Sequence, residues 1–185
     1  AFQYNAESLA SIPHEISRIT LVHLTNSRIG TTSSPLGKSG NGLRERGEPL
    51  VELMNQKRIL VDLSHIDRKG FMHAAEVHDK SQPLIVTHTG VTGVRPHWRN
   101  IDDEQIKLVA DTGGTVGIIF NSNFLAPTWW RCQPEAVLNH AEHVIKVAGE
   151  QAASIGTDYD GLIVPPHGLK QVTDLPRLVQ LMLDR

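Results

Sequence analysis

The chain has 185 residues with 18 basic and 20 acidic side chains, a formal net charge of −2, and 39% apolar residues. This balance is typical of one ordinary globular domain spanning residues 1–185, and it excludes an extended disordered chain. It also argues against a nucleic-acid partner and a membrane-spanning segment, because no run of basic residues and no apolar run of about 20 residues occurs.

The spacing of the apolar residues alternates between a strand pattern and a helix pattern. In chain order it predicts a strand at 18–24, a helix at 43–58, a strand at 59–63, a helix at 67–78, a strand at 84–87, a helix at 102–113, a strand at 115–120, a helix at 134–149, a strand at 152–156 and a helix at 173–185. The strands are nearly continuous apolar runs, which indicates parallel strands covered on both faces.

Five strand–helix units of this kind predict an α/β fold, either an open doubly wound sheet or a segment of a (β/α)8 barrel. A nucleotide-binding sheet is disfavoured, because the glycines of 34–43 neither follow a strand directly nor fit a G-x-G-x-x-G or P-loop pattern. The stretch 25–42, rich in Ser, Thr and Gly, is predicted to be a long loop at the strand-exit face, where active sites commonly lie.

Polar side chains lie at or just past the carboxyl ends of four of the predicted strands. These are His23, His65, His88 and Asp158. Because the carboxyl ends of parallel strands share one face of a barrel, the four can converge there. Imidazole and carboxylate groups suit a divalent metal such as zinc, which can activate a water molecule. The alternative is that the histidines are packing residues and that Asp158 belongs to a turn.

Four motifs at these positions resemble the renal-type (membrane) dipeptidases, peptidase family M19 of the amidohydrolase superfamily. They read "LVDLSHID", "LIVTHTG", "VRPHWRNIDDE" and "SIGTDYDG", and the resemblance runs from about residue 18 to the end of the chain. The resemblance implies a (β/α)8 barrel of which this chain covers roughly strands 4 to 8. It also implies a two-zinc site that hydrolyses dipeptides with metal-activated water.

The resemblance further implies a role for each residue at the strand ends. His65 and His88 match the histidines that hold one zinc. Asp158 matches the aspartate that contacts the other zinc and handles the proton of the attacking water. His23 and Arg99 match residues that bind the substrate, with Arg99 pairing with its free carboxylate. Such a pairing is physically apt, because a guanidinium grips a carboxylate with two hydrogen bonds.

Part of the family's ligand set is not found in this sequence. No His-x-Asp pair precedes His23, and the early acids Glu7 and Glu15 follow no convincing strand. We therefore expect this chain to be the C-terminal part of a dipeptidase barrel, completed by upstream sequence or by a second chain. The alternative is a catalytically incomplete remnant that serves as a binding or assembly subunit.

The motif "HWRN" disfavours a different amidohydrolase, such as a lactonase or deaminase. The partners left open are a homo-oligomer or a second chain that completes the barrel. The absence of a signal-peptide pattern favours the cytoplasm but leaves the compartment open.

The remaining candidates on and near the later helices are expected to be structural. Cys132 is the single cysteine, so it makes no internal disulfide, and no histidine adjoins it to form a catalytic pair. His140 and His143 have metal-pair spacing but are expected on the flank or outer face of the helix at 134–149. Asp67 is expected to cap the helix that follows it.

Several loop residues could also belong to the site. Asp160 is the main rival of Asp158 for the catalytic carboxylate, although a turn role is expected. His97 is expected in a surface turn, and His167 could line the pocket. Trp129 and Trp130 are expected in a packed loop, with a lid or a partner surface as the alternative.

Overall fold

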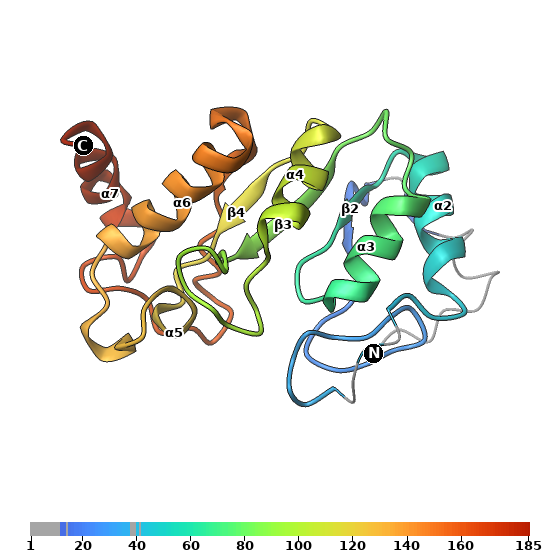
Figure 1. Cartoon of the computed structure of the whole chain (residues 1–185), viewed down its shortest axis with the longest axis horizontal. Coiled ribbons are helices and arrows are strands. Elements are labelled where there is room, and N and C mark those ends of the chain that lie inside the picture. The colour runs from blue at the N-terminus through green and yellow to red at the C-terminus, as the bar shows by residue number, and fades with distance from the viewer. Residues whose placement is uncertain (1–11, 14, 38–39, 41) are drawn as a thin grey trace. The chain divides into compact units, whose positions relative to one another are not determined.

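The structure is a computed structural model that describes residues 12–13, 15–37, 40 and 42–185, so the predicted early acid Glu7 lies outside the described residues (Figure 1). Its strands are β1 (Arg18–Thr20), β2 (Leu60–Asp62), β3 (Leu84–Thr89), β4 (Val116–Ile118) and β5 (Ala153–Ile155). They pair in the order β1-β2-β3-β4-β5, and every pair is parallel. The predicted α/β class with parallel strands is confirmed.

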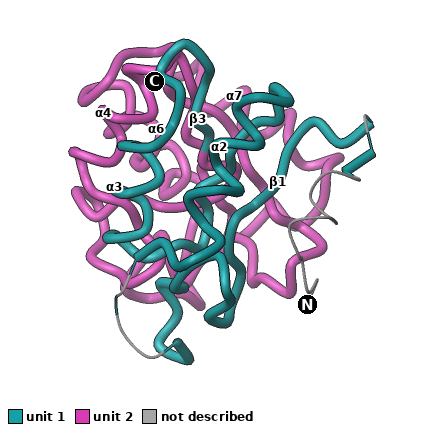
Figure 2. The backbone as a smooth tube through the Cα atoms, turned by 90° about the vertical axis from the view of Figure 1, so that its right-hand side faces the viewer, with its two compact units in different colours: residues 1–85 teal, residues 86–185 magenta. Residues whose placement is uncertain are grey.

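The chain forms two compact units, residues 1–85 and 86–185 (Figure 2). Because both units consist of alternating strands and helices, the architecture within each one agrees with the predicted repeat of strand and helix. The prediction of a single domain over residues 1–185 stays a prediction.

The first unit buries the apolar faces of α2 (Gly47–Lys57) and α3 (Arg68–Val77). Its core side chains include Leu50, Val51, Met54, Val61, Phe71 and Ala74, all 3% exposed or less. The helix predicted over 43–58 begins at Gly47, and Pro49 lies in its first turn, where proline is tolerated. Asp67 caps α3 by accepting a hydrogen bond from Gly70 N at 2.8 Å, as predicted.

The second unit carries α4 (Asp103–Asp111), α5 (Ser122–Leu125), α6 (Glu135–Ala148) and α7 (Leu175–Leu183). Asp102 and Gln105 form a capping box that fixes the start of α4. Val137, Ala141 and Val144 form a buried apolar stripe along α6, whereas Ile145 is 39% exposed. The short helix α5 and the 3-10 turns η1 (Trp129–Arg131), η2 (Glu150–Ala152) and η3 (Val172–Asp174) were not predicted, because segments of three or four residues carry no periodic signal.

The predicted placement of His140 on the flank of the 134–149 helix is wrong. Its side chain is fully buried, because position 140 lies one turn from both Val137 and Val144 on the inner face of α6. Its Nδ1 accepts a hydrogen bond from Val91 N at 2.9 Å, and its Nε2 donates to the Leu125 carbonyl at 3.2 Å. Burial is the main reason why the pKa of His140 falls to about 4, so this imidazole is neutral at physiological pH.

His143 does lie at the flank of α6, as expected. Its Nε2 is 2.7 Å from Oδ1 of Asp103 at the start of α4. The two histidines therefore serve separate packing contacts, since one faces the core and the other bridges two helices.

Candidate active site at the strand ends

In the first unit, His65 leaves β2 with its backbone in the left-handed region, at φ 69°. Few residues other than glycine adopt this conformation, and those that do cluster at functional sites. The His65 side chain is buried, and its ring centroid lies 4.4 Å from that of the exposed His23. The structure thus brings together two of the histidines that the sequence singled out.

The long loop that follows β1 holds the backbone of His65. Ser33 N donates to the His65 carbonyl at 2.8 Å, and the Thr32 hydroxyl donates to the same oxygen at 3.2 Å. The part of the predicted 25–42 loop around Thr32 and Ser33 therefore supports a candidate site residue just after β2.

In the second unit, a β-bulge shapes the end of β3. Val86 pairs with Val116 and Thr89 pairs with Ile118, so that Thr87 and His88 together oppose the single residue Gly117. An extra residue of this kind bends a strand and redirects its side chains, and bulges are common beside active sites. The bulge leaves His88 half-buried, with its Nδ1 2.9 Å from the Thr87 hydroxyl. That hydrogen bond fixes the orientation of the imidazole.

Arg99 is tied directly to the end of β3. Its Nη2 donates to the His88 carbonyl at 2.7 Å, and its side chain is only 3% exposed. The Thr89 hydroxyl donates to the Arg99 carbonyl at 3.1 Å, and Asn100 donates from Nδ2 to the Arg95 carbonyl at 2.8 Å. These hydrogen bonds hold the loop after β3 in place. They keep the positively charged guanidinium of Arg99 beside the backbone of His88.

The same loop has a positive electrostatic environment. The pKa of His97 is lowered, first by burial and then by the nearby charges of Arg95 and Arg99. His97 is half-buried, with its ring 4.6 Å from that of Phe124, so it lies in an aromatic cluster. The prediction of a surface turn for His97 is therefore wrong in part, because a contact distant in sequence covers the ring.

Asp158 follows β5 and also has a left-handed backbone, at φ 58°. Its carbonyl accepts a hydrogen bond from Gly161 N at 2.9 Å, which closes a tight turn. The half-buried carboxylate packs against Gly161, where an added Cβ would overlap it. Asp160, the rival carboxylate, is exposed in the same turn.

Two glycines allow the ends of β3 and β5 to approach each other. A Cβ on Gly156 would collide with the Thr87 carbonyl and would lie 3.1 Å from the Cα of His88. A Cβ on Gly117 would meet the same carbonyl and would lie 3.3 Å from the Cα of Gly156. Since Asp158 is two residues beyond Gly156, its backbone leaves β5 next to the His88 backbone. The sequence reasoning did not single out Gly117, Gly156 or Thr87 as residues that shape this site. The sequence "GTD" (156–158), at the end of a predicted strand, was the one signal that pointed to Gly156.

The donor types at the strand ends suit a divalent metal, because imidazole nitrogen and carboxylate oxygen are common zinc ligands. Among the residues that the structure describes, however, no three His, Cys, Asp or Glu side chains come close enough to hold an ion. The described part of the chain also contains no helix of the length and apolarity that a membrane span requires.

The cysteine and the two neighbouring tryptophans of the loop after β4 have different environments. Cys132 is 2% exposed, and burial raises the pKa of its thiol, so it lacks the character of a nucleophile. The expectation of a packed loop for Trp129 and Trp130 is wrong, because their side chains are 45% and 58% exposed. Both belong to a pocket that His167 also lines.

The structure is an α/β fold of parallel strands, and in its second unit His88, Arg99 and Asp158 lie at or after the carboxyl ends of strands. The family model described as membrane dipeptidase (peptidase family M19) matches residues 13–185. The chain therefore belongs to the M19 peptidase family, as the sequence motifs predicted.

Individual relatives agree with this assignment. An uncharacterized protein in the pqqA 5′ region of Klebsiella pneumoniae is 31% identical over 159 residues, which cover 80% of this chain and 58% of the relative. A metallopeptidase from Rhodobacter sphaeroides, solved with a phosphinate mimic of the dipeptide L-Ala-D-Ala, is 34% identical with a TM-score of 0.74, over 84% of this chain and 43% of that one.

An amidohydrolase from Pseudomonas aeruginosa is 26% identical with a TM-score of 0.79, over 91% of this chain and 57% of that one. The chain thus spans about half the length of the relatives that it matches. Its parallel α/β fold corresponds to that part of their structures, consistent with strands 4 to 8 of a (β/α)8 barrel.

Proposed function

We propose that the protein forms part of a zinc-dependent dipeptidase that hydrolyses short peptides with a free carboxyl end. The observation that carries this proposal is the buried Arg99, whose guanidinium is hydrogen-bonded to the backbone of His88. A fixed guanidinium beside a metal-type histidine suits a substrate whose carboxylate lies a short distance from the bond to be cleaved. Membership of the M19 family supports the same reaction class.

We expect His65 and His88 to hold one zinc ion and Asp158 to contact the second. The hydrogen bond between Thr87 and His88 Nδ1 supports this role for His88, because metal-binding histidines are commonly oriented through their second ring nitrogen. A bound zinc ion would supply a water molecule acidified toward neutral pH and a Lewis acid for the peptide carbonyl.

Side chains of this protein perform the remaining steps of the reaction. Asp158 accepts the proton of the attacking water and returns it to the leaving amine, which is general base and then general acid catalysis. Arg99 binds the substrate carboxylate with two parallel hydrogen bonds and so fixes the peptide bond in position. His23 contacts the substrate near the bond that is cleaved, from its place beside the His65 ring.

The proposal is tested with the His88→Ala and Asp158→Asn variants. We expect each to reduce kcat/KM for unblocked dipeptides by roughly 1,000-fold or more, because each removes a metal ligand or the proton acceptor. The metal content, measured by mass spectrometry after dialysis, should fall in the His88→Ala variant.

The matched control is His73→Ala, since His73 is a partly exposed histidine of α3 that lies 3.7 Å from Glu48. It should leave both activity and metal content unchanged. If His88→Ala and Asp158→Asn both keep full activity, the site assignment is wrong. If the unaltered protein binds no metal and cleaves no dipeptide, the alternative of a binding or assembly subunit is favoured.

A further inference from the structure

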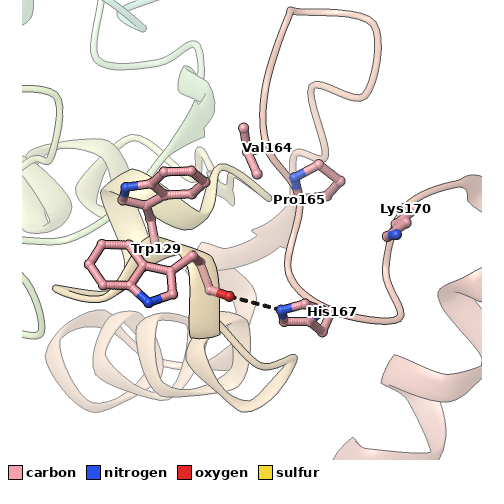
Figure 3. A pocket seen from close by; sticks show the side chains of 6 residues that line it. Trp129, Val164, Pro165, His167 and Lys170 are labelled. Carbon is pink, nitrogen blue, oxygen red and sulfur yellow. Dashed lines mark hydrogen bonds between the residues drawn. The ribbon is translucent and has the colours of Figure 1, made fainter.

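Two loops of the second unit enclose a pocket with a volume of about 460 Å³ (Figure 3). One loop follows β4 and contributes two indole rings, and the other follows β5. The lining residues are Trp129, Trp130, Val164, Pro165, His167 and Lys170. The volume lies within the range of small-molecule sites, roughly 300 to 1,000 Å³.

The two walls of the pocket are held together by hydrogen bonds. Ser122 N donates to the Val164 carbonyl at 2.8 Å, and His167 N donates to the Cys132 carbonyl at 2.9 Å. The His167 imidazole adds a third link through Nε2, which is 3.0 Å from the Trp130 carbonyl (Figure 3). These three hydrogen bonds join the two loops, so the arrangement of the lining residues is set before a ligand arrives.

The lining combines flat apolar surfaces with one permanent positive charge. Trp129 and Trp130 stand edge to face, at an interplanar angle of 90° and a centroid distance of 5.7 Å. Figure 3 shows Trp129 facing Val164, Pro165 and His167 across the opening, with Lys170 on the same loop as these three. A large exposed apolar surface in a preformed pocket is a binding feature rather than a packing feature.

The charge of Lys170 determines the kind of ligand. The ammonium has no ion-pair partner within 4.0 Å among the residues that the structure describes. The nearby carboxylate of Asp174 is engaged with the backbone, because Lys170 N donates to it at 2.8 Å and Gln171 N at 3.2 Å. The pocket therefore carries, on the loop opposite its two indole rings, a cation that makes no direct ion pair within the described residues.

We infer that this pocket binds a small carboxylic acid with an aromatic or branched apolar body. The apolar body lies between the indoles and the Val164–Pro165 wall, and the carboxylate pairs with Lys170. This site is separate from the Arg99 site in its residues and does not depend on a metal. It lies on the strand-exit side of β4 and β5, so such an acid could occupy it beside a substrate or product of the proposed reaction.

The test uses N-acetyl-L-phenylalanine as the probe and its neutral amide as the comparison. Binding is followed through the indole N–H signals in ¹H–¹⁵N NMR spectra, assigned by Trp→Phe substitution. The signals of Trp129 and Trp130 should move in a saturable way, with the acid bound about fivefold more tightly than the amide. Trp98 serves as an internal reference, because it adjoins Arg99 in sequence and reports binding at the dipeptide site.

Lys170→Met should abolish the preference for the acid, whereas Lys107→Met, at an exposed lysine of α4, should preserve it. Equal binding of acid and amide overturns the inference, and so does a preference that survives in Lys170→Met. A titration in which only the Trp98 signal moves also overturns it. Since the readout needs neither metal nor turnover, its failure is distinct from a failure of the proposed dipeptidase activity.

Discussion

The Arg99 guanidinium donates to the backbone carbonyl of His88 across a distance of 2.7 Å. This contact joins the residue expected to recognise the substrate to a residue expected to bind the metal. Because Arg99 is almost fully buried, its position is set by the fold rather than by the substrate. Preorganisation of this kind reduces the entropy that binding would otherwise lose.

The first prediction concerns Arg99→Lys. A lysine keeps the positive charge but loses the two-pronged geometry, so kcat/KM for dipeptides should fall roughly 10- to 100-fold. The measurement compares each dipeptide with its C-terminal amide, which lacks the carboxylate. The preference for the free carboxylate should shrink in Arg99→Lys and persist in Arg28→Lys, a change at an exposed arginine paired with Glu45. An unchanged preference in Arg99→Lys would exclude Arg99 as the carboxylate-binding residue.

The second prediction concerns the acid stability of the fold through His140. Its pKa is about 4 in the folded protein and about 6.5 in the unfolded chain, so only the unfolded chain takes up this proton between those values. The free energy of unfolding should therefore fall as the pH decreases from about 6.5 to about 4, by about 3 kcal/mol from this group. Above pH 6.5 the contribution is complete and constant.

Urea unfolding at several pH values measures this slope. His140→Gln should be less stable at pH 7, since it disturbs the bonds to Val91 and Leu125, but its stability should depend less on pH. The variant His73→Gln, at a partly exposed histidine, should retain the slope of the unaltered protein. Identical slopes for His140→Gln and the unaltered protein would contradict the assignment.

The third prediction concerns Gly156→Ala. The added methyl group meets the Thr87 carbonyl and crowds the His88 backbone, so the end of β3 must shift. We expect a loss of roughly 1 to 3 kcal/mol in the free energy of unfolding and a clear fall in dipeptidase activity. Gly113→Ala is the control, because no atom lies within 4 Å of its added Cβ and only its left-handed φ of 74° opposes the change. It should reduce stability without affecting kcat, and wild-type activity in Gly156→Ala would refute the close approach.

The fourth prediction concerns the single cysteine. Because the Cys132 thiol is buried and its pKa is raised, alkylation by iodoacetamide at pH 7.5 should be at least about 100-fold slower in the native protein than in urea. Intact-mass spectrometry over time gives both rates. Labelling of the native protein at the unfolded rate would show that the thiol is accessible, and would reopen a chemical role for it.

The sequence by itself determined the order of strands and helices and the placement of His65, His88 and Asp158 at strand ends. These features depend on local apolar periodicity, which the neighbouring residues of each segment fix on their own. The same periodicity failed for His140, because whether a flank position of a helix is buried depends on what packs against it. Here Val91 and Leu125, far away in sequence, supply both its cover and its hydrogen bonds.

Only the tertiary structure decided how those strand ends are shaped. The bulge at Thr87 and His88, the left-handed backbones of His65 and Asp158, and the bond from Arg99 to His88 all require segments distant in sequence to meet. The pocket lined by Trp129, Trp130 and His167 has the same origin, since a hydrogen bond there joins residues 37 apart in sequence. The sequence pattern shows which residue types lie at the end of each strand. The packing of segments that are distant in sequence determines how these side chains are oriented and which groups they contact.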